Sequence, residues 1–136
     1  MALFHVWMRV AFAGLVALVT WLTLTPNPES AESGFAFARM VATWLFADTA
    51  QADKVAHFLA YAALGVFACW GRLWPKGLAW ATPLALAAYG GGLELLQGVG
   101  GVREAEFADG LANGLGACAG YAAAYIVSRL MALRAA

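Results

Sequence analysis

The sequence predicts an all-α, polytopic membrane protein: a four-helix transmembrane bundle with a short interfacial or re-entrant helix between its first two spans. Two observations predict this class. Hydrophobic residues make up 63% of the 136 residues and charged residues 12%, whereas a soluble domain is about half apolar and about a quarter charged. The apolar residues also fall into four runs of about 20 residues, and a helix of that length crosses a bilayer. The length is that of a single domain, residues 1–136.

Residues that break helices separate the four runs. We predict spans at roughly residues 4–24, 55–74, 78–96 and 111–131. Pro26 and Pro28 end the first run, Gly71 and Pro75 mark the turn after the second, and a glycine cluster follows the third. The first run starts with a basic residue, as a signal peptide does. It is long, however, and no small-x-small cleavage site follows it, so we expect it to remain as a span.

A shorter apolar segment lies between the first two runs, at residues 34–47. Its large apolar residues Phe37, Met40, Trp44 and Leu45 recur at helical spacing. The segment is too short to span a bilayer. We therefore expect a helix that lies in the membrane interface or re-enters the membrane.

Charged residues predict the orientation of the spans. With four spans, both termini and the second loop share one side, which carries Arg9, Arg72, Lys76, Arg129 and Arg134. The opposite side carries three basic residues, Arg39, Lys54 and Arg103, together with all eight acidic residues. Because basic residues favour the cytoplasmic side, we expect both termini to be cytoplasmic and the acidic residues to face outward.

Polar residues gather at the outward ends of the last three spans. Asp53, His57 and Tyr61 are spaced four apart and therefore share one face of the second span. Asp109 and Asn113 have the same spacing on the fourth span. The complete set is Asp53, Lys54, His57, Tyr61, Glu94, Gln97, Asp109 and Asn113, and Arg103 can reach it from the last loop. We expect these residues to form one site at the outer membrane face.

Two interpretations of this set stay open. Ionisable residues inside spans usually face a bundle interior or a watery cavity and mark functional sites, and Glu94 stands inside an apolar run. The set can instead be a hydrogen-bonded polar plug that holds the helices together, with Asp53 and Asp109 as helix caps. In a functional site we expect His57 and Glu94 to be direct partners, with Asp53 and Asn113 in a second layer.

Small residues predict where helices pack. Gly116 and Gly120 form a small-xxx-small seam on the fourth span, and the glycines at 90–92 allow close approach below Glu94. Cys69 and Cys118 lie within apolar runs, where we expect them to behave as small apolar residues and to form no disulfide.

A net charge of zero without a basic stripe excludes nucleic acid as an expected partner.

The order and spacing of these residues resemble the VanZ-like family of small bacterial membrane proteins. The matching pattern is Asp53-Lys54-x-x-His57-Phe58-x-x-Tyr61, Glu94-x-x-Gln97, Arg103 and Asp109-x-x-x-Asn113-x-x-Gly116, and it extends over the predicted spans. Pro26 resembles the family's proline after the first span, although members more often have a serine pair before it. The resemblance implies the inner (cytoplasmic) membrane of a bacterium. The family's namesake lowers sensitivity to teicoplanin, an antibiotic that acts at the outer envelope, but the resemblance implies no chemical mechanism.

Two functions of different classes follow. The first is binding or modification of a lipid headgroup, a cell-wall precursor or another lipid-linked envelope component. Lys54 and Arg103 would then meet phosphate or carboxylate, while Glu94, Asp109 and Asn113 would hold hydroxyls or an amine. Asp53, Tyr61 and Gln97 complete the expected ligand-binding set. The expected partners are membrane lipids and such a precursor, and an oligomer stays open.

The second function is a membrane-embedded enzyme. Asp53 would orient His57 as a general base, and Glu94 or Asp109 would be the acid. A divalent metal held by His57, Glu94 and Asp109 stays open, because imidazole and carboxylates suit zinc or manganese, and the sequence leaves any cofactor unknown. No serine or cysteine accompanies the set, so covalent catalysis by either is not expected. Transport is a weaker alternative, since the polar residues do not continue to the inner face.

Overall fold

The protein is built entirely of helices over the part of the chain that the structure describes. This structure is a computed structural model, and it describes residues 2–25, 32–47, 49–74, 78, 80–101 and 106–134. The helices are α1 (Ala2–Leu24), α2 (Glu32–Phe46), α3 (Ala52–Gly71), α4 (Ala81–Val99) and α5 (Phe107–Arg134), and no strand occurs among the described residues. The predicted all-α class is therefore confirmed.

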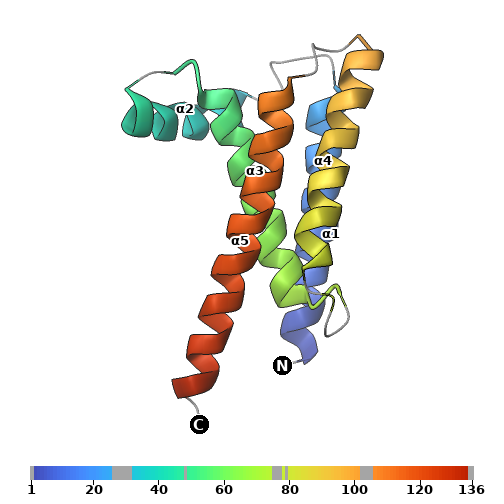
Figure 1. Cartoon of the computed structure of the whole chain (residues 1–136), viewed down its shortest axis with the longest axis vertical. Coiled ribbons are helices and arrows are strands. Elements are labelled where there is room, and N and C mark those ends of the chain that lie inside the picture. Colours follow the sequence, from blue (N-terminus) through green and yellow to red (C-terminus); the bar gives the residue numbers. More distant parts are fainter. Residues whose placement is uncertain are drawn as a thin grey trace.

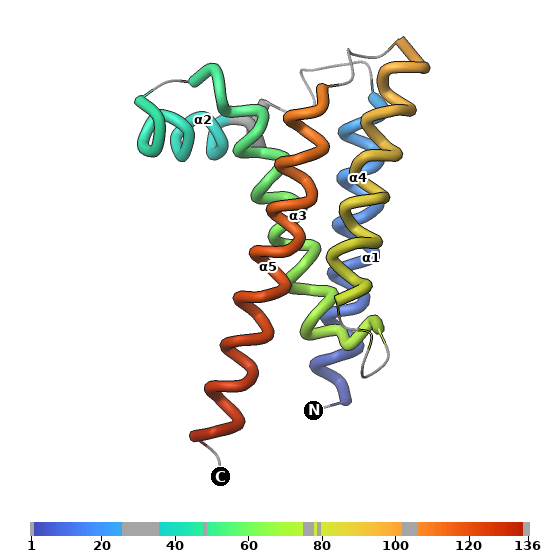
Figure 2. The backbone as a smooth tube through the Cα atoms, in the orientation of Figure 1, coloured from blue at the N-terminus to red at the C-terminus, as the bar shows by residue number. Residues whose placement is uncertain are grey.

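Four of the helices lie side by side along the long axis, and α2 lies across one end of them (Figure 1). α1 begins and α5 ends at the opposite end (Figure 1). Figure 2 shows that α1 and α4 run toward the end at which α2 lies, whereas α3 and α5 run away from it. α3 and α5 are therefore parallel, and they form the most extensive helix contact in the described structure.

Glycines bring the backbones of α3 and α5 together. A Cβ atom at Gly116 would collide with the carbonyl of Phe58, and one at Gly120 would collide with the carbonyl of Ala62. On the facing helix, Gly65 lies in the same way against the backbone of Ala117. Small residues are what allow two helices to approach this closely inside a membrane. The predicted seam on the last span is confirmed, and its partner is α3.

Side chains of α1 close the end of the bundle that is remote from α2. Arg9 Nε donates a hydrogen bond of 2.8 Å to the carbonyl of Gly71, and His5 Nδ1 lies 2.6 Å from the carbonyl of Trp70. Both carbonyls belong to the last turn of α3, where they have no partner within the helix. α3 ends there because Arg72 adopts a left-handed conformation with φ of 50°. The second predicted run therefore ends as a helix at Gly71, before its expected end at residue 74.

α2 packs on the first turns of α3 through small residues. Ala38 and Ala42 are buried against Ala52 and Val55, while large apolar side chains such as Trp44 are exposed. The expected helix between the first two spans is therefore present. Its position in the membrane interface stays a prediction.

Three described helices, α1, α3 and α5, are long and apolar enough to cross a membrane. α4 has 19 residues but is not among the three, because Glu94, Gln97 and its glycines lower its hydropathy. The predicted count of four spans therefore stays a prediction. α3 begins at Ala52 and α5 at Phe107, earlier than predicted. The charged residues that precede each apolar run already belong to the first turn of the helix.

Candidate functional site

The polar cluster stands at the α2 end of the bundle, where α3 and α5 both begin. The contact between Gly116 and Phe58 fixes the register of these parallel helices. One turn earlier on α5, Asn113 meets His57, and a further turn earlier Asp109 meets Lys54 in the first turn of α3. The packing seam therefore assembles the site. We define the site cluster as Asp53, Lys54, His57, Glu94, Glu106, Asp109 and Asn113.

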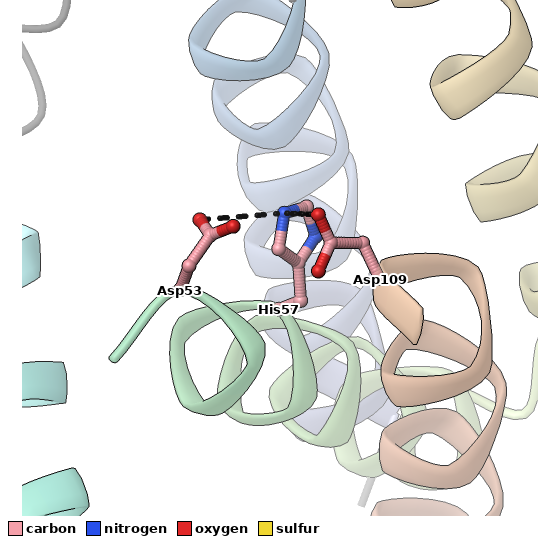
Figure 3. A group of neighbouring side chains, drawn as sticks. All are labelled: Asp53, His57 and Asp109. Carbon is pink, nitrogen blue, oxygen red and sulfur yellow. Dashed lines mark ion pairs between the residues drawn. The ribbon is translucent and has the colours of Figure 1, made fainter. Parts of the chain in front are cut away.

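His57 is the centre of this cluster. Its Nδ1 atom lies 3.0 Å from Oδ1 of Asn113, and because an amide oxygen only accepts, Nδ1–H donates. In a neutral imidazole, Nε2 then carries a lone pair. It faces Oδ1 of Asp53 and Oδ2 of Asp109, each 3.8 Å away (Figure 3). In this neutral form, the three acceptors face a point that suits a donor N–H or O–H group, or a cation.

Lys54 holds the other oxygens of the same two carboxylates. Its Nζ atom lies 3.7 Å from Oδ2 of Asp53 and 3.2 Å from Oδ1 of Asp109. It also donates a hydrogen bond to Glu106, which immediately precedes α5. Asp109 is the most buried of these acids, with 2% of its surface exposed. The ammonium group of Lys54 is therefore already surrounded by carboxylates.

α4 contributes Glu94, whose Oε1 atom lies 3.8 Å from Nδ1 of His57. Glu94 is buried, with 6% of its surface exposed. Gly90 makes this approach possible, because a Cβ atom there would lie 2.8 Å from the Cβ of Asn113 and 3.0 Å from Cε1 of Tyr61. The predicted close approach below Glu94 is confirmed at this one glycine.

The structure brings six of the nine predicted site residues together: Asp53, Lys54, His57, Glu94, Asp109 and Asn113. Tyr61 instead lies in the apolar core beneath them, its ring 6.3 Å from that of Tyr89. Its hydroxyl is buried without a hydrogen bond among the described residues. Gln97 is buried on α4, and no hydrogen bond to the cluster is found for it within the described ranges. Arg103 lies outside the described residues, as does Pro26.

Two expectations were wrong: one concerned which residue lies nearest to His57, and the other concerned the helix caps. Asn113, expected in a second layer, is closer to His57 than Glu94 is. Asp53 and Asp109 are not helix caps, because Gln51 occupies the N-cap of α3 and both acids lie in the first turns of their helices. Acids in a first turn still interact favourably with the helix dipole.

The site cluster contains one residue that was not predicted, Glu106. Its sequence position, just before a helix that starts with a buried acid, was the available signal, but nothing local indicates that it meets Lys54. The grouping of potential metal ligands also differs from the expected one. Ligand atoms of Asp53, His57 and Asp109 lie within 4.8 Å of one another, so Asp53 takes the place expected for Glu94.

The charge of the described cluster is predominantly negative. Four carboxylates, those of Asp53, Glu94, Glu106 and Asp109, surround one ammonium group and one imidazole. Carboxylates and a neutral imidazole nitrogen accept hydrogen bonds. The arrangement therefore suits hydroxyls, an amine or a metal cation better than it suits an anion.

The fold and the cluster define a small polytopic α-helical membrane protein with a buried polar site at one end of its bundle. The VanZ/LLP1 family model matches residues 12–128, a range that includes every residue of the site cluster. The chain therefore belongs to the VanZ/LLP1 family. No curated protein and no solved structure matches the chain.

Proposed function

We propose that this protein binds the headgroup of a lipid or lipid-linked envelope component at the outer face of the bacterial inner membrane. The observation that carries the proposal is the position of the half-buried His57 among carboxylates of its own helix and of two further helices. A polar plug needs only hydrogen-bonding groups. An excess of carboxylates, of which Glu94 and Asp109 are buried, disfavours the empty protein, because like charges at short range repel each other. A bound donor or cation relieves that repulsion.

The direction of the helices supports four spans. α3 and α5 are parallel and both begin at the site (Figure 2). If both cross the membrane, the chain must return between them, and α4 is the helix that connects their opposite ends. Its 19 residues extend about 28 Å, close to the hydrocarbon thickness of about 30 Å.

The distribution of charge supports an outward site and cytoplasmic termini. Arg9 and Arg72 stand at the end of the bundle opposite the site, and Arg134 lies in the last turn of α5. Basic residues favour the cytoplasmic side. α2, with its exposed apolar side chains, would then lie in the outer interface.

The chemistry of the cluster favours a headgroup with an amine or hydroxyls. Lys54 is held by three carboxylates, so phosphate recognition by Lys54 would require it to leave them. Lipids and lipid-linked wall precursors present such headgroups at the outer leaflet. The family's namesake affects teicoplanin sensitivity at the same side of the membrane, and we extend the proposal to a role in the cell envelope on that basis.

A second candidate is a metal-dependent membrane enzyme, favoured by the spacing of Asp53, His57 and Asp109. Asn113 would fix the ring of His57 so that Nε2 is the ligand, as partners of metal-bound histidines do. Lys54, 3.2 Å from Asp109, competes with a metal for the same carboxylate. Metal analysis of the purified protein separates the two candidates, since only the second requires a bound ion.

The proposal is tested by identifying the lipids that remain with the purified protein. Native mass spectrometry of the full chain should detect a bound amine- or hydroxyl-bearing lipid, and Glu94→Gln should lose most of it. Glutamine keeps the volume and hydrogen-bonding capacity of Glu94 but removes its charge, so we expect circular dichroism to be unchanged. Thr82→Val is the matched control, because Thr82 is a buried polar residue near the other end of α4. Equal lipid content in the wild type and in Glu94→Gln would contradict the proposal.

A further inference from the structure

A groove runs along the surface between α4 and α5 and ends at the site cluster. Its volume is about 670 Å³. Glu94 and Glu106 line one end, and the remaining lining is apolar or small, as far as Pro83 and Cys118. The groove therefore joins an acidic end to a long apolar channel, and this is the shape that an amphiphile requires.

Two glycines widen this groove although no neighbouring atom requires a glycine at either position. Gly91 and Gly110 line it, and a Cβ atom at either position would meet nothing within 4 Å. Gly90, Gly116 and Gly120, in contrast, are each required by a close neighbour. Glycine inside a helix costs roughly 0.5–1 kcal/mol relative to alanine. Gly91 and Gly110 carry this cost where the helix contact does not need it, and they keep the groove wide.

The length of the groove matches one leaflet of a bilayer. Its lining extends from Pro83 to Leu95 on α4 and from Phe107 to Cys118 on α5. These stretches rise about 18 Å and about 16 Å at ~1.5 Å per residue, and half of a hydrocarbon core of about 30 Å is about 15 Å. A single hydrocarbon chain can therefore lie in the groove while its headgroup stays level with the cluster.

We infer that the groove holds one hydrocarbon chain of an outer-leaflet lipid whose amine-bearing headgroup lies at Glu94 and Glu106. This inference rests on the proposed function and names its ligand class. The amine follows from charge complementarity, since two acidic residues line the headgroup end of the groove and Lys54, which is bound to Glu106, is the one described cation beside them. An ammonium group would donate hydrogen bonds to carboxylates in the way that Lys54 already does to Glu106.

The test fills the groove and leaves the acids unchanged. Gly91→Leu and Gly110→Leu each place a side chain into the groove, and Gly92→Leu is the matched control. Gly92 is adjacent to Gly91 and equally unobstructed, but it does not line the groove. Leucine favours helix more than glycine does, so we expect all three variants to fold. Binding is measured by titrating phosphatidylethanolamine or phosphatidylglycerol of identical chains into detergent-solubilised full-length protein, with native mass spectrometry as the readout.

We expect phosphatidylethanolamine to bind the wild type and Gly92→Leu with similar affinity, and phosphatidylglycerol to bind all proteins weakly. Gly91→Leu and Gly110→Leu should weaken phosphatidylethanolamine binding about tenfold, the effect of displacing about two CH2 groups. Unchanged binding by both groove variants, or an equal loss in Gly92→Leu, would overturn the groove as the chain site. Equal binding of the two lipids by the wild type would overturn the amine. Neither result bears on the proposed function, which is tested separately by the amount of lipid that remains bound to the purified Glu94→Gln variant.

Discussion

At the scale of single residues, Lys54 links three parts of the chain at the site. It contacts Asp53 on its own helix, Asp109 on α5 and Glu106 just before α5. Asp53 and Asp109 each use one oxygen for Lys54 and direct the other toward His57. Lys54 therefore offsets the carboxylates that would otherwise repel each other around the imidazole.

Replacing Lys54 by methionine should destabilise the protein at neutral pH. Lys54 is partly exposed but its partner Asp109 is buried, so removing the ammonium group leaves uncompensated charge and costs roughly 1–3 kcal/mol of unfolding free energy. The deficit should shrink as the pH falls, because protonated carboxylates no longer repel each other. Unfolding in detergent, followed by circular dichroism at neutral and mildly acidic pH, measures both effects.

Glu106→Gln is the control for this prediction, because the side chain of Glu106 is 44% exposed. An exposed partner contributes at most about 1 kcal/mol, so this variant should unfold nearly as the wild type does. A Lys54→Met protein as stable as the wild type at both pH values would mean that the charge of Lys54 is not needed to offset the repulsion between the carboxylates.

Six of the seven residues of the site cluster could be predicted from the sequence, but most of the pairs they form could not. Spacing of four placed Asp53 and His57 on one face, and an acid in an apolar run singled out Glu94. Whether Asn113 or Glu94 lies nearest to His57 depends on the register between α3 and α5, which backbone contacts at Gly116 and Gly120 fix. Glu106 was missed for a related reason, since its partner is remote in sequence.

At the scale of the helices, the seam between α3 and α5 determines whether the site forms. Replacing Gly116 and Gly120 together by leucine should prevent folding, because each new side chain would meet a carbonyl of α3. Ala123 is exposed on the same helix, and Ala123→Leu should be tolerated. Yield of monodisperse protein in size-exclusion chromatography and thermal unfolding in detergent compare the two. A double variant as stable as Ala123→Leu would show that the seam does not hold α3.

Hydropathy predicted the existence of the helices better than their ends. All four apolar runs are helices, and the shorter segment at 34–47 proved to be a helix as well. The ends differ because a run of apolar residues stops at a charged residue, whereas the helix can include it. Asp53, for example, lies in the first turn of α3. The end of α3 depends on the conformation of Arg72 and on partners from α1, which no local pattern encodes.

At the scale of the whole molecule, the parallel arrangement of α3 and α5 places the site at one end and the chain's C-terminal helix end at the other (Figure 1). α5 has 28 residues and extends about 42 Å, which exceeds a hydrocarbon core of about 30 Å. If α5 crosses the membrane, Asp109 and Arg134 must therefore stand at opposite faces. The location of the C-terminal end of α5 consequently reports the location of the site.

A reporter fused after Ala136 tests the central claim, an outward-facing site on a four-span bundle, most directly. Fused to the full chain and expressed in bacteria, green fluorescent protein should fluoresce and alkaline phosphatase should be inactive, because the C-terminus is predicted to be cytoplasmic. The same reporters at the N-terminus should give the same result, because four spans return the chain to its starting side. An active phosphatase at the C-terminus would contradict the account, since the cluster around His57 would then face the cytoplasm.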